Sequence, residues 1–191
     1  MKCILDLKSG KCPPWAALQL AAYTLLNVSG IDNLFFYEEG HIYLASDGTT
    51  ELPSVTNILK SEGFIDDTWF NDYVRDRGNN IHLACHLDDI NDLDEDTVGE
   101  VELPYLEAYR KFKRESGFMV EESEVPKANL KLMFAGTPDK QGYFPNGNLK
   151  RAGLELHKDG TYKLIPFTDR NDINIWRACL ACYQWKKIYL K

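Results

Sequence analysis

The sequence lacks a long apolar run, although 44% of its 191 residues are hydrophobic. A membrane-spanning helix needs about 20 consecutive apolar residues. The first residues alternate with charges instead of forming the apolar region of a secretory signal. There is also no internal repeat and no low-complexity tract. These absences predict a soluble, cytoplasmic protein with no membrane partner, built as one globular domain over residues 1–191.

A disulfide framework is also lacking. The chain has five cysteines, an odd number, and their spacing is unlike that of a disulfide-bonded scaffold. This favours reduced thiols inside a cell. Cys179 and Cys182 form a C-x-x-C pair, but Ala178 and Leu180 beside them indicate a helix interior. We therefore expect both to be buried, inert thiols.

Basic residues are nearly absent from the middle of the chain. Residues 61–107 contain 14 acidic residues and only two arginines, Arg75 and Arg77, which gives a net charge of -12. Because the whole chain carries -7, the remaining residues carry +5, including Arg110 and Lys113. The overall acidity counts against tight, non-specific coating of duplex DNA. A locally basic groove on an acidic protein still attracts phosphates.

The hydrophobic patterns predict an α/β or α+β fold with one mixed sheet flanked by helices. Strands are expected at 3–8, 151–157 and 161–167, with two more inside 119–144 and a hairpin over 35–44. Helices are expected at 13–26, 67–87, 101–116 and 171–188, and Ser54 should cap a short helix that ends at Lys60. Asn146-Gly147 predicts a hairpin turn, and residues 27–33 are expected to form a linker.

Two acidic residues and a lysine stand in or beside apolar segments. Asp6 and Lys8 are two residues apart in the expected strand 3–8, so their side chains point to the same face. Asp139 ends the apolar stretch 133–138, where a loop would more commonly place Asn or Gly. A lone D-x-K on a surface strand is usually a solvated pair. Together, the three side chains can hold a divalent metal ion and orient a water molecule against a phosphodiester.

Four further residues gain meaning only in combination with this set. His82 lies in an expected helix, where a single histidine is more often structural than a metal ligand. Gln19 and Tyr23 are four residues apart and share one helix face, which suits the edge of a core equally well. Glu124 precedes Asp139 by fifteen positions.

In combination, these residues resemble the PD-(D/E)xK nuclease superfamily, and more closely its RecB-like and phage-exonuclease branch. Pro138-Asp139 matches the first acidic motif of the family, and Asp6-Leu7-Lys8 matches the second. Gln19-Leu20-Ala21-Ala22-Tyr23 matches the Q-x-x-x-Y helix. Residues 77–82 match the helix that bears the upstream histidine, and residues 53–59 look like the opening segment of phage members. The resemblance covers nearly the whole chain and implies a restriction-endonuclease-like core.

The resemblance also implies a role for each residue. The metal ion would be held by His82, Asp139, Asp6 and the carbonyl group of Leu7, with Glu124 as a nearby ligand or water holder. Lys8 would orient or activate the attacking water, or stabilise charge on the phosphate, while Gln19 and Tyr23 would steady Lys8 and the DNA backbone. Hard oxygen ligands suit Mg²⁺, and one imidazole makes Mn²⁺ a good substitute.

The order of the motifs departs from that of the family. In the family the histidine, glutamate and Pro-Asp motifs precede Asp-x-Lys and Q-x-x-x-Y, whereas here the last two occupy residues 6–23. Moving residues 2–26 to a position between Asn148 and Leu149 would restore the usual order. The strand 3–8 must therefore lie beside the strand that ends at Asp139 if the two acids are to share a metal ion. The linker 27–33 is long enough for this to happen within one chain or by exchange between two.

The favoured function is a metal-dependent DNA exonuclease that acts at DNA ends, in recombination, repair or phage DNA processing. Its partner would be DNA, as double-stranded ends or a single strand, and a recombinase or single-strand annealing protein is a further candidate. One alternative is a non-catalytic accessory module that binds DNA ends, and another is a structure-specific or restriction-type endonuclease. The complete Asp/Asp/Lys set counts against the non-catalytic alternative. The iron–sulfur cluster of some RecB-like nucleases is not expected, because it needs four suitably placed cysteines.

Overall fold

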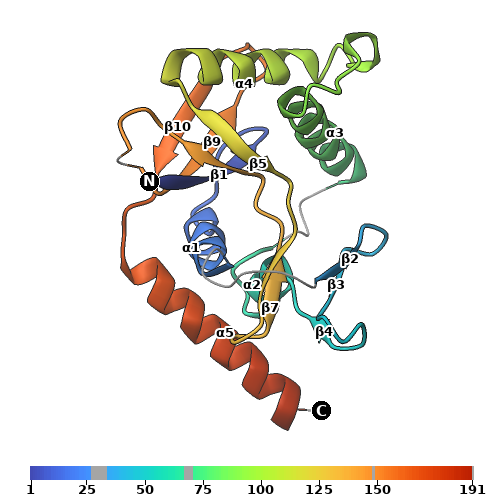
Figure 1. The fold of residues 1–191 in the computed structure, drawn as a ribbon, viewed down its shortest axis with the longest axis vertical. Helices are drawn as coiled ribbons and strands as arrows, with labels where there is room; N and C mark the ends of the chain where they lie inside the picture. The colour runs from blue at the N-terminus through green and yellow to red at the C-terminus, as the bar shows by residue number, and fades with distance from the viewer. Residues whose placement is uncertain (27–33, 67–70, 148, 191) are drawn as a thin grey trace. The chain divides into compact units, whose positions relative to one another are not determined.

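The computed structural model describes residues 1–26, 34–66, 71–147 and 149–190, and the expected linker at 27–33 lies outside them (Figure 1). The chain forms two compact units, each assembled from three separate stretches of sequence. The first unit comprises residues 1–16, 67–124 and 139–168, and the second comprises residues 17–66, 125–138 and 169–191. That the chain is one nuclease-like domain stays a prediction.

The first unit is built on a five-stranded mixed sheet with the strand order β10-β9-β1-β8-β5. The strands are β1 (Lys2–Lys8), β5 (Met119–Ser123), β8 (Lys140–Tyr143), β9 (Arg151–Leu156) and β10 (Tyr162–Pro166). Strand β1 runs parallel to β9 and antiparallel to β8, and the remaining neighbours pair antiparallel. The most N-terminal strand is therefore the central strand of the sheet.

Two helices, α3 (Asp72–Asp89) and α4 (Leu103–Ser116), pack against this sheet. Leu5 and Leu7 of β1 are fully buried in one core cluster with Ile81 of α3 and Phe112 of α4. Side chains alternate along a strand, so Asp6 lies on the opposite face of the sheet. The predicted mixed α and β architecture, with helices packed on a mixed sheet, is confirmed.

Helix α3 begins later and ends later than the sequence pattern predicts. Its N-cap is Asn71, whose side chain accepts a hydrogen bond of 2.9 Å from the backbone N–H of Val74. At the other end Asp88 and Asp89 remain helical although they open the acidic segment, because Lys113 of α4 donates hydrogen bonds to both. The segment between the helices contains only a single 3₁₀ turn, η1 (Glu95–Thr97).

The second unit contains smaller elements. Its helices are α1 (Ala16–Leu26, which belongs to this unit from Ala17 onward), α2 (Val55–Ser61) and α5 (Asn171–Tyr189). Strands β2 (Phe35–Tyr37), β3 (Ile42–Leu44) and β4 (Glu51–Leu52) form one sheet, and β6 (Lys127–Asn129) pairs with β7 (Phe134–Gly136). Ser54 caps α2 as predicted, because its hydroxyl accepts the backbone N–H of Asn57 at 3.0 Å.

Two predictions about residues 119–147 are wrong. The segment 119–144 contains four strands instead of two, because β6 and β7 have three residues each, too few for alternation to reveal. Asn146-Gly147 does form a turn, in which the Gly147 N–H donates to the Phe144 carbonyl at 3.0 Å. It does not form a hairpin, because β1 lies between β8 and β9 and separates the strands on either side of the turn.

The long helices carry frequent polar residues. Helix α3 includes Arg75, Asp76 and Arg77 near its start, and α5 includes Lys186 and Lys187 near its end. Within the described residues, no helix has both the length and the apolar character that crossing a membrane requires.

Candidate metal centre

Three elements of the first unit bring an imidazole and two carboxylates together. His82 lies in α3, Glu124 directly follows β5, and Asp139 directly precedes β8. One possible ligand atom from each residue lies within 4.8 Å of the others. The three side chains are therefore close enough to share one metal ion.

The distances within this trio suit a shared ion better than direct hydrogen bonds. His82 Nδ1 lies 3.5 Å from Glu124 Oε1 and 3.7 Å from Asp139 Oδ2, which is longer than a good hydrogen bond. Ligand atoms bound to one ion are expected to stand roughly 3–4 Å apart, given metal–ligand distances near 2 Å. The buried Oε1 atom of Glu124 has no hydrogen-bond partner within the described residues.

The backbone at Glu124 is unusual and connects the segments of two candidate ligands. Glu124 has φ = 53°, in the left-handed region that is uncommon for residues other than glycine. Its N–H donates to the Asp139 carbonyl at 3.0 Å. Such a conformation costs free energy and persists only where the surrounding structure holds it in place.

Asp6 and Lys8 form an ion pair beside this trio. Lys8 Nζ donates to Asp6 Oδ1 at 2.8 Å, and the Asp6 side chain is only 1% exposed. The second oxygen, Asp6 Oδ2, is buried and makes no hydrogen bond within the part of the chain that the structure describes. A buried carboxylate oxygen without a partner is costly. Asp6 is not among the residues whose possible ligand atoms lie within 4.8 Å of one another, which are His82, Glu124 and Asp139, so its role as a metal ligand stays a prediction.

Strand β1 is connected directly to Asp139. The backbone N–H of Leu7 donates to Asp139 Oδ2 at 2.6 Å, and Leu5 pairs with Lys140 in the antiparallel register of β1 and β8. Asp139 thus directly precedes β8, the strand beside β1, whereas the sequence pattern predicted that it would end a strand. The difference arises because the apolar stretch before it forms β7 of the second unit. The role of the Leu7 carbonyl stays a prediction.

Charge in the site is unbalanced toward the negative. Burial raises the pKa of Asp6 to about 7, and the charge of Asp139 adds to this rise while Lys8 opposes it. Burial alone would lower the pKa of Lys8, but the charges of Asp6 and Asp139 outweigh it and raise that pKa. In the same way Asp139 and Glu124 outweigh the effect of burial and raise the pKa of His82. The three carboxyl groups outnumber the two basic groups, Lys8 and His82, and this excess of acids favours an additional cation.

Sequence reasoning missed a buried ionic network next to the candidate ligands. The Lys140 side chain is fully buried, with Nζ 2.9 Å from Asp89 Oδ2 and donating to Ser123 Oγ at 2.6 Å. Tyr109 also donates to Asp89, at 2.8 Å. Ser123 and Lys140 are the direct chain neighbours of Glu124 and Asp139, so this network holds in place the two segments that carry these candidate ligands.

Lys140 could have been recognised only from its pairing. A lysine after Pro-Asp is expected at the surface, but its partner in the sheet is Leu5, which faces the core. The side chain of Lys140 therefore points into the core and requires the buried acid Asp89. This relation depends on the strand order and is invisible in the local sequence.

A second missed residue, Glu155, holds the loop that follows β1. Glu155 is 5% exposed, pairs with Lys8 in the register of β1 and β9, and accepts the Cys12 N–H at 2.6 Å. Gly153 stands next to Asp6, and a Cβ there would lie 2.6 Å from Cys12 Sγ. Glycine therefore lets the loop lie close over the strand. The sequence contained one indication of this role for Glu155, because an acid is unusual inside the apolar strand 151–157.

Gln19 and Tyr23 both lie in α1, within the second unit. Gln19 Nε2 donates to Tyr23 Oη at 2.9 Å, and both residues are buried. The predicted common helix face is confirmed. That these side chains face Asp6 and Asp139 stays a prediction.

The cysteine prediction is correct for only one member of the C-x-x-C pair. Cys179 is buried, but Cys182 is exposed. Trp176, Cys179 and Leu180 form the buried face of α5, and Cys182, two residues after Leu180, points to the opposite side of the helix. The prediction that both thiols are buried and inert therefore fails for Cys182.

The geometry in the first unit links five of the residues singled out in the sequence, Asp6, Lys8, His82, Glu124 and Asp139. They come from segments up to 133 positions apart, since Asp6 precedes Asp139 by that separation. Neither protein-family models nor curated protein sequences give a match to this chain.

Proposed function

We propose that this chain is a metal-dependent deoxyribonuclease with a restriction-endonuclease-like core, similar to the RecB-like branch of the PD-(D/E)xK superfamily. One observation carries the proposal. The Asp6/Lys8 pair on β1 is held next to Asp139 by the hydrogen bond from Leu7 N–H, while Asp139 lies 3.7 Å from His82. Two acids, a lysine and an imidazole at such separations match the chemistry of phosphodiester hydrolysis.

The donor set fits a hard divalent cation. Asp6, Asp139 and Glu124 offer carboxylate oxygens, two of which are buried without a hydrogen bond within the described residues, and His82 offers one nitrogen. This set suits Mg²⁺, with Mn²⁺ as a substitute. When bound, such an ion supplies Lewis acidity toward a phosphoryl oxygen and lowers the pKa of a coordinated water.

The remaining chemistry falls to Lys8. Asp6 and Asp139 raise its pKa, so its Nζ stays protonated at neutral pH. Lys8 can therefore donate a hydrogen bond to the attacking water or to a phosphate oxygen, and it is poorly suited to remove a proton. Asp6 orients the ammonium group through their 2.8 Å hydrogen bond. Gln19 and Tyr23 are proposed to steady Lys8 and the DNA backbone.

We propose that the substrate is a DNA end, because the sequence contains no recognisable module for reading a base sequence. The direct test is to incubate the protein with linear DNA and with closed-circular DNA, each in Mg²⁺, Mn²⁺ or EDTA. Degradation of linear DNA alone, in either metal and not in EDTA, is expected. Equal activity in EDTA would overturn the metal mechanism. Cutting of closed circles would identify an endonuclease, and binding of ends without hydrolysis would identify an accessory module.

A further inference from the structure

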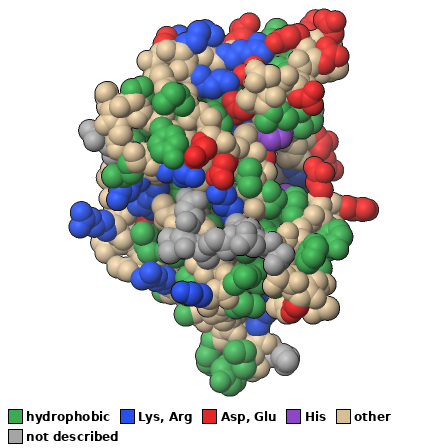
Figure 2. Space-filling view, viewed as in Figure 1, with side chains coloured by type: hydrophobic (Ala, Val, Ile, Leu, Met, Phe, Trp, Pro, Cys, Tyr) green, Lys and Arg blue, Asp and Glu red, His purple; other side chains and the backbone are tan. Residues whose placement is uncertain are grey.

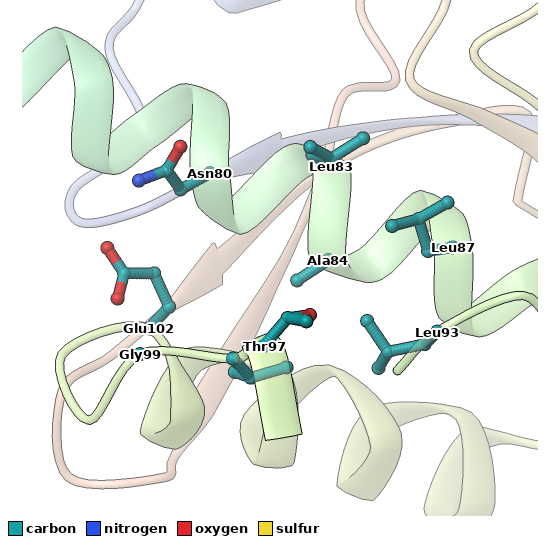
Figure 3. Close-up of a pocket in the computed structure, with 9 residues that line it drawn as sticks. Asn80, Leu83, Ala84, Leu87, Leu93, Thr97, Gly99 and Glu102 are labelled. Carbon is teal, nitrogen blue, oxygen red and sulfur yellow. The ribbon is translucent and has the colours of Figure 1, made fainter. Parts of the chain in front are cut away.

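A groove lies on the first unit between α3 and the segment that leads to α4. Its volume is about 310 Å³, and its apolar lining comes from Leu83, Ala84, Leu87, Leu93 and Val98. Figure 3 shows one wall formed by α3 and the other by the chain from Leu93 to Glu102. We call this feature the α3–α4 groove. None of its lining residues belongs to the candidate metal centre.

Large apolar side chains remain exposed in and beside the α3–α4 groove. Leu83, in its lining, is 55% exposed, and Ile90 and Val101, which flank the lining residues in sequence, are 51% and 48% exposed. These side chains are not needed by the core of the first unit. Apolar side chains gathered around a groove and rimmed by polar residues are typical of a docking surface.

Acidic residues that we call the rim acids alternate with the lining residues along the segment from Asp92 to Glu100, and within the described residues none of them pairs with a lysine or arginine. Asp92, Asp94, Asp96 and Glu100 are exposed, and no lysine or arginine occurs between Arg77 and Arg110. Acidic side chains gather over this segment, at the upper right of Figure 2.

Nearby bases on α4 do not offset this charge. Arg110 is bound by Asp88 and Glu95, and Lys113 by Asp88 and Asp89. The four rim acids take no part in these ion pairs. An occupant of the groove must therefore bring positive charge together with apolar side chains.

We propose that the α3–α4 groove docks a basic amphipathic helix of a partner protein. Apolar side chains on one face of that helix, at i, i+3, i+4 and i+7, would enter the groove, and its lysines or arginines would lie against the rim acids. The volume is near the lower limit for a ligand pocket, roughly 300–1,000 Å³, which is suited to a few side chains. The acidic rim repels DNA and anionic membranes, so neither is a fitting occupant.

Docking there would leave the metal centre open. On α3, His82 is two residues from both Asn80 and Ala84, so it points about 200° around the helix from them. The groove and the candidate metal centre thus use different faces of one helix. The partner is inferred from this surface alone and does not depend on nuclease activity.

The test uses the full chain and a fluorescent synthetic peptide of about 18 residues. Its leucines stand at i, i+3, i+4 and i+7, on one helix face, and its lysines occupy the other face. A second peptide has serine in place of leucine and the same charge. Fluorescence anisotropy, without metal or DNA, should show saturable binding of the first peptide. The second peptide should bind at least about tenfold more weakly. Equal binding of both peptides, or of neither, would overturn the proposal.

Variants locate the binding surface. Leu83→Glu, and separately the set Asp92→Lys, Asp96→Lys and Glu100→Lys, should each weaken binding by about tenfold or more. The matched controls are Ile188→Glu, at an exposed position of α5, and the set Glu38→Lys, Glu39→Lys and Glu51→Lys, at exposed positions of the second unit. These controls should change the dissociation constant by no more than about twofold.

A thermal unfolding curve for each variant distinguishes loss of the surface from loss of the fold, and Leu83→Ser provides a milder change at the same position. Equal weakening by the groove variants and their controls would show that only net charge matters and would refute the groove. Leu83-dependent binding to phosphatidylcholine vesicles, with no binding of the peptide, would assign the surface to a membrane instead. Because the assay contains no metal and no DNA, it can fail while the nuclease proposal stands, and the reverse also holds.

Discussion

At the residue scale, Asp139 and Lys8 lie in the same site but have different partners, so their loss should affect different steps. Asp139 lies within reach of His82 and Glu124, whereas the close partner of Lys8 is Asp6. Asp139→Ala should lose both Mn²⁺ affinity and turnover. Lys8→Ala should keep Mn²⁺ affinity within a few-fold and lose turnover by about 10²-fold or more. Calorimetric titration with Mn²⁺ and single-turnover hydrolysis of linear DNA measure the two effects. Near-normal turnover of Lys8→Ala would show that Lys8 takes no part in hydrolysis.

Lys140 is expected to act on stability. Among the described residues, Lys140→Met leaves the buried Asp89 with Lys113 and Tyr109 as partners, so the free energy of unfolding should fall by about 2–4 kcal/mol. Lys150→Met changes an exposed lysine and should stay within about 0.5 kcal/mol of the parent. Urea denaturation measures both variants. Adding Asp89→Asn to Lys140→Met should recover part of the loss, and no recovery would mean that Asp89 is not the group left unpaired.

At the element scale, α3 and α4 are joined by ion pairs whose strength depends on pH. Burial alone would raise the pKa of Asp88, but hydrogen bonds from Lys113 and Arg110 outweigh it and lower that pKa. A carboxyl group with a lowered pKa in the folded state stabilises the fold fully above its unfolded pKa, about 3.9. That contribution is lost as the pH falls through the folded pKa.

The free energy of unfolding should therefore decrease below about pH 4, in part because Asp88 becomes protonated. Asp88→Asn should be less stable at pH 6 and should show a smaller decrease between pH 5 and pH 3. Urea denaturation over this range measures the difference, with Asp92→Asn, an exposed acid outside the network, as the control. An identical slope in Asp88→Asn and the parent chain would contradict the assignment.

The same scale shows where sequence reasoning succeeds and where it stops. The alternation in residues 3–8 placed Asp6 and Lys8 on one face, and the capping pattern placed Ser54 before α2, because both are decided by neighbours along the chain. The depth of Lys140 and the absence of a hairpin at Asn146-Gly147 depend on β1 lying between β8 and β9. That strand order is set by contacts between distant segments, which a local pattern does not contain.

At the scale of the whole molecule, the position of β1 indicates how the chain could be reconnected. A Cβ on Gly147 would lie 3.9 Å from the backbone N of Met1, so the start of β1 lies beside the turn that follows β8. A chain in which residues 2–26 are moved between Asn148 and Leu149 would join β8 to β1 as an antiparallel hairpin. We expect it to keep the strand order and metal-dependent hydrolysis and to refold faster, because sequence separation between the paired strands decreases.

Stopped-flow refolding and hydrolysis of linear DNA test this rearranged chain, with a flexible linker placed after Leu26. The control carries the same linker at the turn but keeps the order of the present sequence. A folded chain that refolds no faster than the control would show that pairing of β1 with β8 does not limit folding. A folded chain without hydrolysis would show that the present connections are needed by the site.

The central position of β1 has a consequence for the synthesis of this protein on the ribosome. β1 is made before its partners in the sheet, and the hydrogen bond from the Leu7 N–H to the Asp139 carboxylate joins residues 132 positions apart. At about 5–20 residues per second, this strand waits on the order of 10 seconds for β8. During that time its apolar side chains and both of its hydrogen-bonding edges lack their final neighbours, which is the condition that chaperones recognise. Expression at low temperature or with added chaperone should therefore raise the yield of folded protein mainly by protecting this one strand.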